Sequence, residues 1–221
     1  HYVIFAHDLP VVPGMGARPG GISRNAEDFA DGASDFIVAL GDWEVLADPF
    51  ISNVRAGTFM HELGHNLGLG HGGVILDSQG NVADAEHTNY KPNHLSVMNY
   101  AFQNRGLRKK DGLLGLYSYG HFDYSRFGPE ALPSLDENGL SEPDGFQADP
   151  IMSEYGTVYF CQGTDDPVIV DNLVQPVDWN CDEDETDEDV ATDINRSDNG
   201  GLSVLTTVAE WPYLNYTGGS I

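Results

Sequence analysis

The stretch HELGHNLGLGHGG, residues 61–73, is the part of the chain that most restricts its fold, because it combines three histidines and a glutamate with five glycines. Upstream of it, apolar residues recur at helical spacing after a serine and an asparagine that can cap a helix. We therefore predict a helix over residues 52–69 that begins at Ser52 or Asn53. Gly68 can take the left-handed conformation that ends a helix and turns the chain sharply.

The spacing of the three histidines is that of a metal site. On a helix, His61 and His65 lie one turn apart on the same face, and Glu62 is rotated by about 100° so that it points beside the ion. After the turn, His71 can return to supply a third nitrogen. Three neutral imidazoles leave one tetrahedral position for water, which is typical of a catalytic rather than a structural zinc site. A lone histidine would more often be a surface or core residue, but a set at these fixed offsets rarely arises by chance.

A second motif follows the third histidine after about 25 residues. Residues 96–100, SVMNY, have the form of a methionine-containing turn. The pattern HExxHxxGxxH followed by such a turn resembles the metzincin clan of zinc endopeptidases, and the chain is similar to secreted bacterial members of it. The resemblance is strong over residues 55–103. Gly72, which follows the third histidine, departs from the residues that mark several branches and leaves the branch unassigned.

The resemblance implies a role for each matching residue. His61, His65 and His71 bind Zn²⁺, Glu62 activates a zinc-bound water as general base, and Met98 forms the hydrophobic floor beneath the metal. Peptide bonds are then hydrolysed by that water.

The tyrosine of the second motif has two possible roles. By resemblance, Tyr100 matches a residue that serves in some branches as a further ligand and as a hydrogen-bond donor to the transition state. Its alternative role is a core aromatic of the turn. Three further histidines, His87, His94 and His121, are expected at the surface or around the ligands, not among them.

The fold expected from the resemblance is α/β, a metzincin-like twisted mixed sheet with the zinc-bearing helix against it and an irregular C-terminal subdomain. We predict a catalytic domain over residues 1–150 and an acidic, disulfide-containing subdomain or appendage over residues 151–221. The apolar run YVIFA at 2–6 predicts a strand buried on both faces. The run at 35–41 predicts a strand on the upper rim of the cleft, where an extended protein or peptide substrate would add to the sheet.

The same resemblance places a strand, a helix and a further strand before the strand at 2–6. These elements are expected to be missing from this chain. An N-terminal fragment of the same precursor is therefore a candidate partner.

Composition excludes several classes of protein. The 35 acidic and ten basic residues give a formal net charge of −25, which repels nucleic acid and anionic lipid. No apolar run reaches the roughly 18 residues of a membrane span. Cys161 and Cys181 lie twenty residues apart in a loop-rich region, so we predict a disulfide and a secreted, extracellular protein, with two unpaired thiols as the alternative.

The acidic tail is a candidate calcium site, because carboxylate and amide oxygens at alternating positions are the ligands that Ca²⁺ requires. A solvated acidic loop is the alternative. The candidate ligands are Asp182, Asp184, Asp187, Asp193, Asn195 and Asp198.

Two classes of function agree with these motifs. The first is a secreted zinc-dependent endopeptidase. The second is a non-catalytic module for binding or adhesion that zinc and calcium stabilise, or an inactive processed fragment. Turnover that disappears on Glu62→Ala distinguishes them, whereas zinc content does not.

Overall fold

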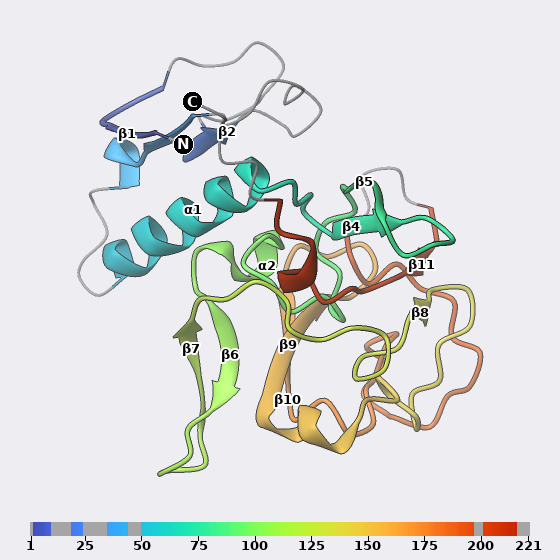
Figure 1. The fold of residues 1–221 in the computed structure, drawn as a ribbon. Helices are drawn as coiled ribbons and strands as arrows, with labels where there is room; N and C mark the ends of the chain where they lie inside the picture. Colours follow the sequence, from blue (N-terminus) through green and yellow to red (C-terminus); the bar gives the residue numbers. More distant parts are fainter. Residues whose placement is uncertain (1, 10–18, 24–34, 44–49, 197–200, 216–221) are drawn as a thin grey trace.

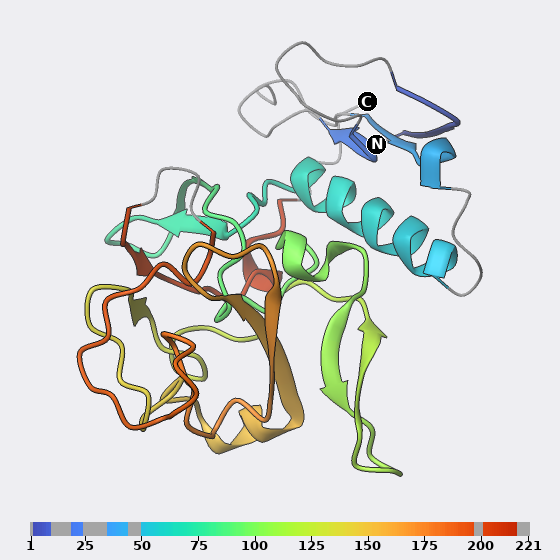
Figure 2. The same ribbon diagram turned by 180° about the vertical axis from the view of Figure 1, so that it is seen from behind.

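The computed structural model describes residues 2–9, 19–23, 35–43, 50–196 and 201–215. The fold is mixed α/β, with several small sheets and few helices, as Figures 1 and 2 show from opposite sides. None of the helices in these ranges is long and apolar enough to cross a membrane.

A three-stranded sheet and the long helix α1 form the N-terminal part. The strands are β1 (Val3–Ala6), β2 (Gly21–Ser23) and β3 (Phe36–Ala39), in the order β1-β3-β2. β3 runs parallel to β1 and antiparallel to β2, and a short 3₁₀ helix, η2 (Gly41–Trp43), follows it. The apolar face of the sheet packs on α1 through a small core.

Two predictions about these strands are wrong. β3 has a neighbour on each side, so its backbone groups are engaged and it cannot be the rim strand that accepts a substrate. Among the strands that the structure describes, β2 is at the edge on that side. β1 is not buried on both faces either, because among the described residues it pairs only with β3, and Phe5 is 64% exposed. Apolar composition alone does not distinguish a central strand from an edge strand.

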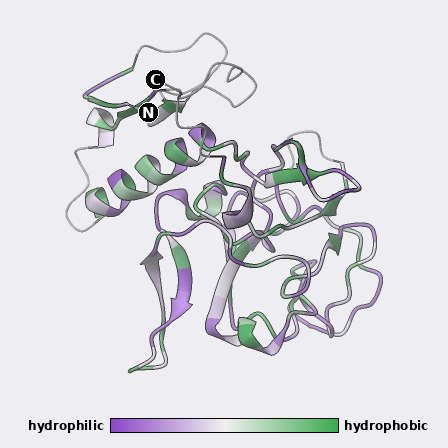
Figure 3. Cartoon of the chain, viewed as in Figure 1, coloured by the Kyte–Doolittle hydropathy of each residue, from purple (hydrophilic) through white to green (hydrophobic). Residues whose placement is uncertain are grey.

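Helix α1 extends over Phe50–Asn66. The predicted range was 52–69, so the helix begins two residues earlier and ends three residues earlier than predicted. Polar and apolar bands alternate along it, as an amphipathic helix requires (Figure 3). Gly68 has a φ of 94° and follows the last turn, where the Leu69 backbone N–H donates to the Gly64 carbonyl at 3.0 Å. The predicted stop at Gly68 is confirmed.

The remainder of the chain is built from hairpins, short helices and long loops. A hairpin of β4 (Gly73–Leu76) and β5 (Val82–Glu86) follows the histidine motif. The short helix α2 (Tyr100–Gln103) comes after the methionine turn. A four-stranded antiparallel sheet has the order β10-β9-β6-β7, with bounds β6 (Leu107–Lys110), β7 (Tyr117–His121), β9 (Tyr155–Phe160) and β10 (Pro167–Asp171). The smaller elements are β8 (Leu135–Asp136), η3 (Pro150–Glu154), β11 (Val204–Leu205) and η4 (Trp211–Tyr213).

The largest apolar core lies in this second part, around the fully buried Trp179. Its members come from both sides of residue 150, including Phe102 and Leu132 before it and Leu173 after it. The division of the chain at residue 150 stays a prediction.

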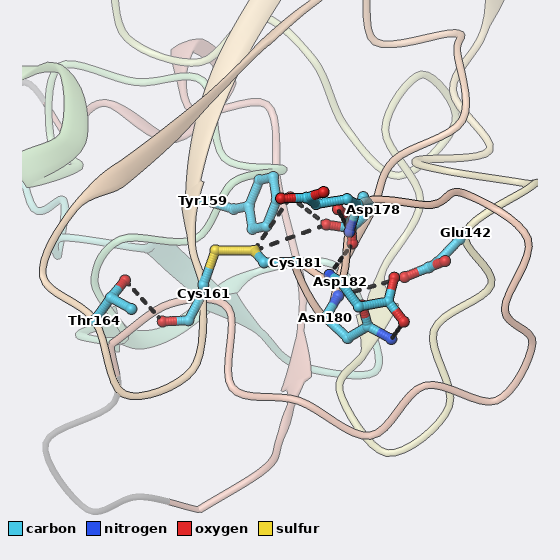
Figure 4. Close-up of a disulfide and its surroundings, with 9 residues drawn as sticks. Glu142, Tyr159, Cys161, Thr164, Asp178, Asn180, Cys181 and Asp182 are labelled. Carbon is cyan, nitrogen blue, oxygen red and sulfur yellow. Dashed lines mark hydrogen bonds between the residues drawn. A yellow bond between two sulfur atoms is a disulfide. The ribbon is translucent and has the colours of Figure 1, made fainter.

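The predicted disulfide is confirmed. Cys161, directly after β9, is bonded to Cys181 in the acidic loop (Figure 4). The loop is held further by Tyr159, whose hydroxyl donates to the Asp178 carbonyl. A disulfide of this kind indicates a non-reducing environment.

Candidate metal centre

The end of α1 and the turn after it bring the three histidines together. His61 and His65 project from the last turns of the helix, and His71 follows the turn at Gly68. One ligand atom from each of them lies within 4.8 Å of the other two. In the described ranges this is the only such group of three among histidine, cysteine and acidic side chains, so the sequence motif marks the one candidate metal centre found there.

Hydrogen bonds orient two of the imidazoles toward a common point. The Nδ1 of His61 is 3.0 Å from the carbonyl oxygen of Val97, and the Nδ1 of His65 is 2.8 Å from that of Leu69. A carbonyl oxygen can only accept, so both Nδ1 atoms are assigned as the donors, which leaves both Nε2 atoms with a free lone pair.

The two Nε2 atoms of His61 and His65 are 3.1 Å apart. Two lone pairs at this distance repel each other unless a cation lies between them. Nitrogen ligands about 2.05 Å from a tetrahedral ion are about 3.3 Å from one another, so the separation fits a shared metal. The donor set therefore suits a divalent metal ion that accepts imidazole.

Burial keeps the imidazoles in the neutral form that binds metal. Desolvation, and after it the charge of His65, lowers the pKa of His61 to about 3, although the hydrogen bond to Val97 opposes the shift. The pKa of His71 is lowered to about 3 by burial and then by the charges of His65 and His87. Burial also lowers the pKa of His65, against the effect of its hydrogen bond to Leu69.

Glu62 lies beside the histidines under the edge strand β2. It is 6% exposed, and burial raises its pKa to about 8. The backbone of β2 passes so close that a Cβ atom built on Gly21 would be 2.5 Å from the Glu62 Oε1 atom. A hydrogen bond from the Asn66 amide to the Ser23 hydroxyl also joins β2 to α1. The glutamate is thus held next to β2, the edge strand of the described sheet, and outside the group of metal ligands.

The methionine turn, residues 96–100, packs against helix α1. Met98 is fully buried, and a Cβ atom built on Gly64 would lie only 2.2 Å from its sulfur. The same turn supplies the Val97 carbonyl that orients His61. Met98 therefore packs against the helix that carries the histidines.

Tyr100, the first residue of α2, faces the histidines. Its ring centroid is 4.5 Å from that of His71 and 5.4 Å from that of His61. The side chain is 42% exposed, which favours a residue of the site over a core aromatic. Burial, followed by the charge of Glu62, raises its pKa, so the phenol keeps its proton at neutral pH.

Sequence reasoning did not identify Glu210, a completely buried residue next to η4. Its carboxylate accepts hydrogen bonds from the Ser96 hydroxyl at 2.5 Å and from the Ser125 backbone N–H at 2.6 Å, and it is 3.1 Å from the Nε2 of His94. The Ser96 hydroxyl in turn accepts from the Met98 N–H at 3.1 Å. Glu210 therefore fixes the methionine turn from more than 100 residues away, and no local pattern indicates this.

His87, His94 and His121 are not among the candidate ligands. His94 is buried in the network just described, whereas His87 is exposed, with its ring centroid 6.4 Å from that of His71. His121 is exposed on β7. A cavity of about 590 Å³ opens beside His65 and is lined by the β4–β5 hairpin and the segment 212–215.

The predicted calcium ligands do not gather in this way. Asp182 and Asp184 are exposed, and their oxygens accept bonds from the backbone of their own loop. Within the described ranges, no three carboxylates of the tail bring oxygens within 4.8 Å of one another. Asp187 and Asp193 belong to no such group, Asn195 is buried, and Asp198 lies outside the described residues. Calcium binding stays a prediction.

Comparison with protein-family models found no matching family, and comparisons with curated proteins and with solved structures found no match.

Proposed function

We propose that this protein is a zinc-dependent endopeptidase of the metzincin type. One observation carries the proposal: the imidazoles of the buried His61 and the half-buried His65 and His71 converge on one point, with the Glu62 side chain and the Tyr100 phenol beside them. The mixed sheet packed on a histidine-bearing helix agrees with the α/β fold that the sequence resemblance implies.

Zinc is the metal that this donor set suits best. Three imidazole nitrogens without thiolate or additional carboxylate ligands are typical of catalytic zinc, which keeps one position open. When bound, zinc would polarise the carbonyl of a peptide bond and acidify water. His61, His65 and His71 would hold it.

The residues around the metal would perform the proton transfers. A cation held by the three histidines would favour the ionised form of Glu62. That carboxylate would accept a proton from the attacking water and donate it to the amine of the departing peptide. Tyr100, protonated and half-exposed, would donate a hydrogen bond to the oxygen that becomes negatively charged. Neither role requires a residue from outside the described site.

The edge strand β2 is the proposed docking place for the substrate. β2 pairs with β3 along one side, and its backbone lies next to Glu62. An extended peptide that added to its other side would bring its own carbonyl groups near the site. This assignment replaces the rim strand predicted at 35–41.

The test compares the wild-type protein with Glu62→Ala and with a chelated sample in the cleavage of casein. Glu188→Ala, which removes an exposed carboxylate of the acidic tail, is the matched control. We expect wild type and control to cleave and the other two samples to be inactive. Mass spectrometry of the products identifies the cleaved bonds.

A wild-type protein that binds one zinc per chain and releases no peptide would refute the proposal and favour a non-catalytic binding module. Secretion agrees with the disulfide and forms part of the proposal. Detection of the protein, disulfide intact, in culture medium would test it.

A further inference from the structure

The β6–β7 hairpin ends in a cluster of exposed leucines that the proposed enzymatic function does not use. Leu113, Leu114 and Leu116 are 90%, 70% and 65% exposed. Isolated exposed leucines are common on protein surfaces, but three within four residues form a contiguous apolar patch. We will call residues 111–116 the leucine tip.

The leucine tip projects from the body of the protein. Figures 1 and 2 both show the hairpin extending away from the rest of the chain, and Figure 3 shows an apolar end beyond a polar strand. A Cβ atom built on Gly112 would meet nothing within 4 Å, and one on Gly115 would meet only the Lys110 side chain at 3.9 Å. The leucines are therefore displayed on a projection rather than lining a groove.

The turn that displays them is well defined. The Asp111 carboxylate accepts the backbone N–H groups of Leu113 at 2.7 Å and Leu114 at 2.9 Å. Its own N–H donates to the Leu116 carbonyl at 2.7 Å, and its carbonyl accepts from the Gly115 N–H at 2.8 Å. The backbone thus holds the three apolar side chains in a fixed exposed arrangement, with little further order to impose on binding.

Polarity changes stepwise along the hairpin. The pair Lys110 and Tyr117 lies next to the leucine tip, and Lys109 pairs with Ser118 one step farther away. The next aromatic residue, Tyr119, lies under the Arg108 guanidinium, 5.0 Å from its ring centroid. An apolar end followed by aromatic and basic residues is the order met on moving outward from the hydrocarbon of a bilayer through its headgroups.

The distribution of charge agrees with this order. Four of the ten basic residues of the chain lie within residues 105–110, although the chain as a whole carries a net charge of −25. Lys110 is 3.9 Å from the Glu154 carboxylate, Lys109 lies over the Tyr155 ring at 5.1 Å, and Arg108 is paired with Asp171. Lysines at this level can contact lipid phosphate, whereas the remaining acidic surface is repelled by anionic lipid.

We propose that the leucine tip inserts into the interface of a zwitterionic phospholipid bilayer and attaches the protein to the membrane surface. A bilayer accepts a projecting apolar tip without a preformed cavity. A protein partner would instead have to supply a pocket matched to the three leucines.

Flotation of the full-length protein with phosphatidylcholine vesicles tests the proposal. The test variant is Leu113→Ser/Leu114→Ser/Leu116→Ser, which alters only exposed side chains. The matched control is Ile151→Ser/Ile169→Ser/Val204→Ser, which removes three apolar side chains that are 58%, 50% and 55% exposed elsewhere. We expect the tip variant to reduce vesicle binding at least about tenfold and the control to change it less than about twofold.

A second variant reports insertion directly. Leu114→Trp should show a blue-shifted fluorescence spectrum with vesicles, and brominated lipid should quench it. Wild-type protein that fails to bind vesicles, or a tip variant that binds as well as wild type, overturns the proposal. Binding to anionic vesicles alone would indicate simple electrostatic attraction and would also overturn it, as would a tip-dependent self-association without vesicle binding. Glu62→Ala should bind vesicles normally, so the result is separate from that of the activity test.

Discussion

Replacing Glu210 by glutamine tests whether the segment around η4 supports the candidate metal centre. The wild-type carboxylate accepts from the Ser96 hydroxyl and the Ser125 N–H through one oxygen, and its other oxygen faces His94. Glutamine preserves the shape, and its carbonyl oxygen can replace the first of these two oxygens. The charge is lost and an amide N–H₂ then faces the imidazole.

The magnitude follows from the number of bonds affected. A hydrogen bond to a charged group contributes about 1.5–3 kcal/mol and a neutral one about 0.5–1.5 kcal/mol, so two weakened bonds cost about 2 kcal/mol of unfolding free energy. The effect should extend to the metal, because Ser96 also holds the turn whose Val97 carbonyl orients His61. Loss of such support typically weakens metal affinity by about 10–100-fold, and we expect about tenfold here.

The matched control is Glu142→Gln. Glu142 is also completely buried, and its carboxylate accepts hydrogen bonds from two backbone N–H groups of the acidic tail, those of Asn180 at 3.4 Å and Asp187 at 3.1 Å. Urea unfolding in chelator measures stability, and competition with a chromophoric chelator measures zinc affinity. Both variants should lose stability, and only Glu210→Gln should lose zinc affinity. Equal zinc affinities for the two variants would refute the reasoning.

Three further predictions concern stability. Gly64→Ala places a Cβ atom 2.2 Å from the Met98 sulfur and should lower the unfolding free energy by about 1–3 kcal/mol. In a Met98→Ala background this loss should be smaller by at least about 1 kcal/mol. Additive effects of the two substitutions in urea unfolding would contradict the packing of Gly64 on Met98. Cys161→Ser/Cys181→Ser opens a loop with a sequence separation of 20 and should lower the unfolding free energy by about 3 kcal/mol, an effect that reduction of the wild type should reproduce. Burial raises the pKa of Glu137, so the folded state binds its proton more tightly, and stability should fall as pH rises from the ordinary carboxyl pKa toward the raised one. Glu137→Gln removes this contribution, and pH-dependent unfolding curves that stay parallel to those of wild type would contradict it.

Local patterns in the sequence were sufficient to predict the helix, its stop at Gly68 and the placement of its histidines, because a helix fixes which residues share a face. Cys161 and Cys181 were predicted as a pair from their spacing and the loops around them. Each of these features depends on residues close together in the chain.

Features that depend on distant segments were not predictable. The run at 2–6 is apolar enough for a central strand, yet Phe5 is largely exposed because β3 is the one strand paired with β1 among the described residues. Whether β3 or β2 forms the edge depends on strand order, which hydrophobic patterns do not encode. Glu210 carries no sequence signal, since its partners Ser96 and Ser125 become neighbours only in the folded chain.

The contacts of the last described segment affect when the metal centre can form during synthesis. The methionine turn is held by Glu210, and the Asn215 N–H donates to the Leu67 carbonyl at the end of α1. A ribosome that has translated the histidine motif and the turn has not yet supplied either contact. The nascent chain therefore carries the three histidines before it carries the contacts that support the helix end and the methionine turn. We expect the candidate metal centre to reach its final geometry only after residue 215 has left the exit tunnel.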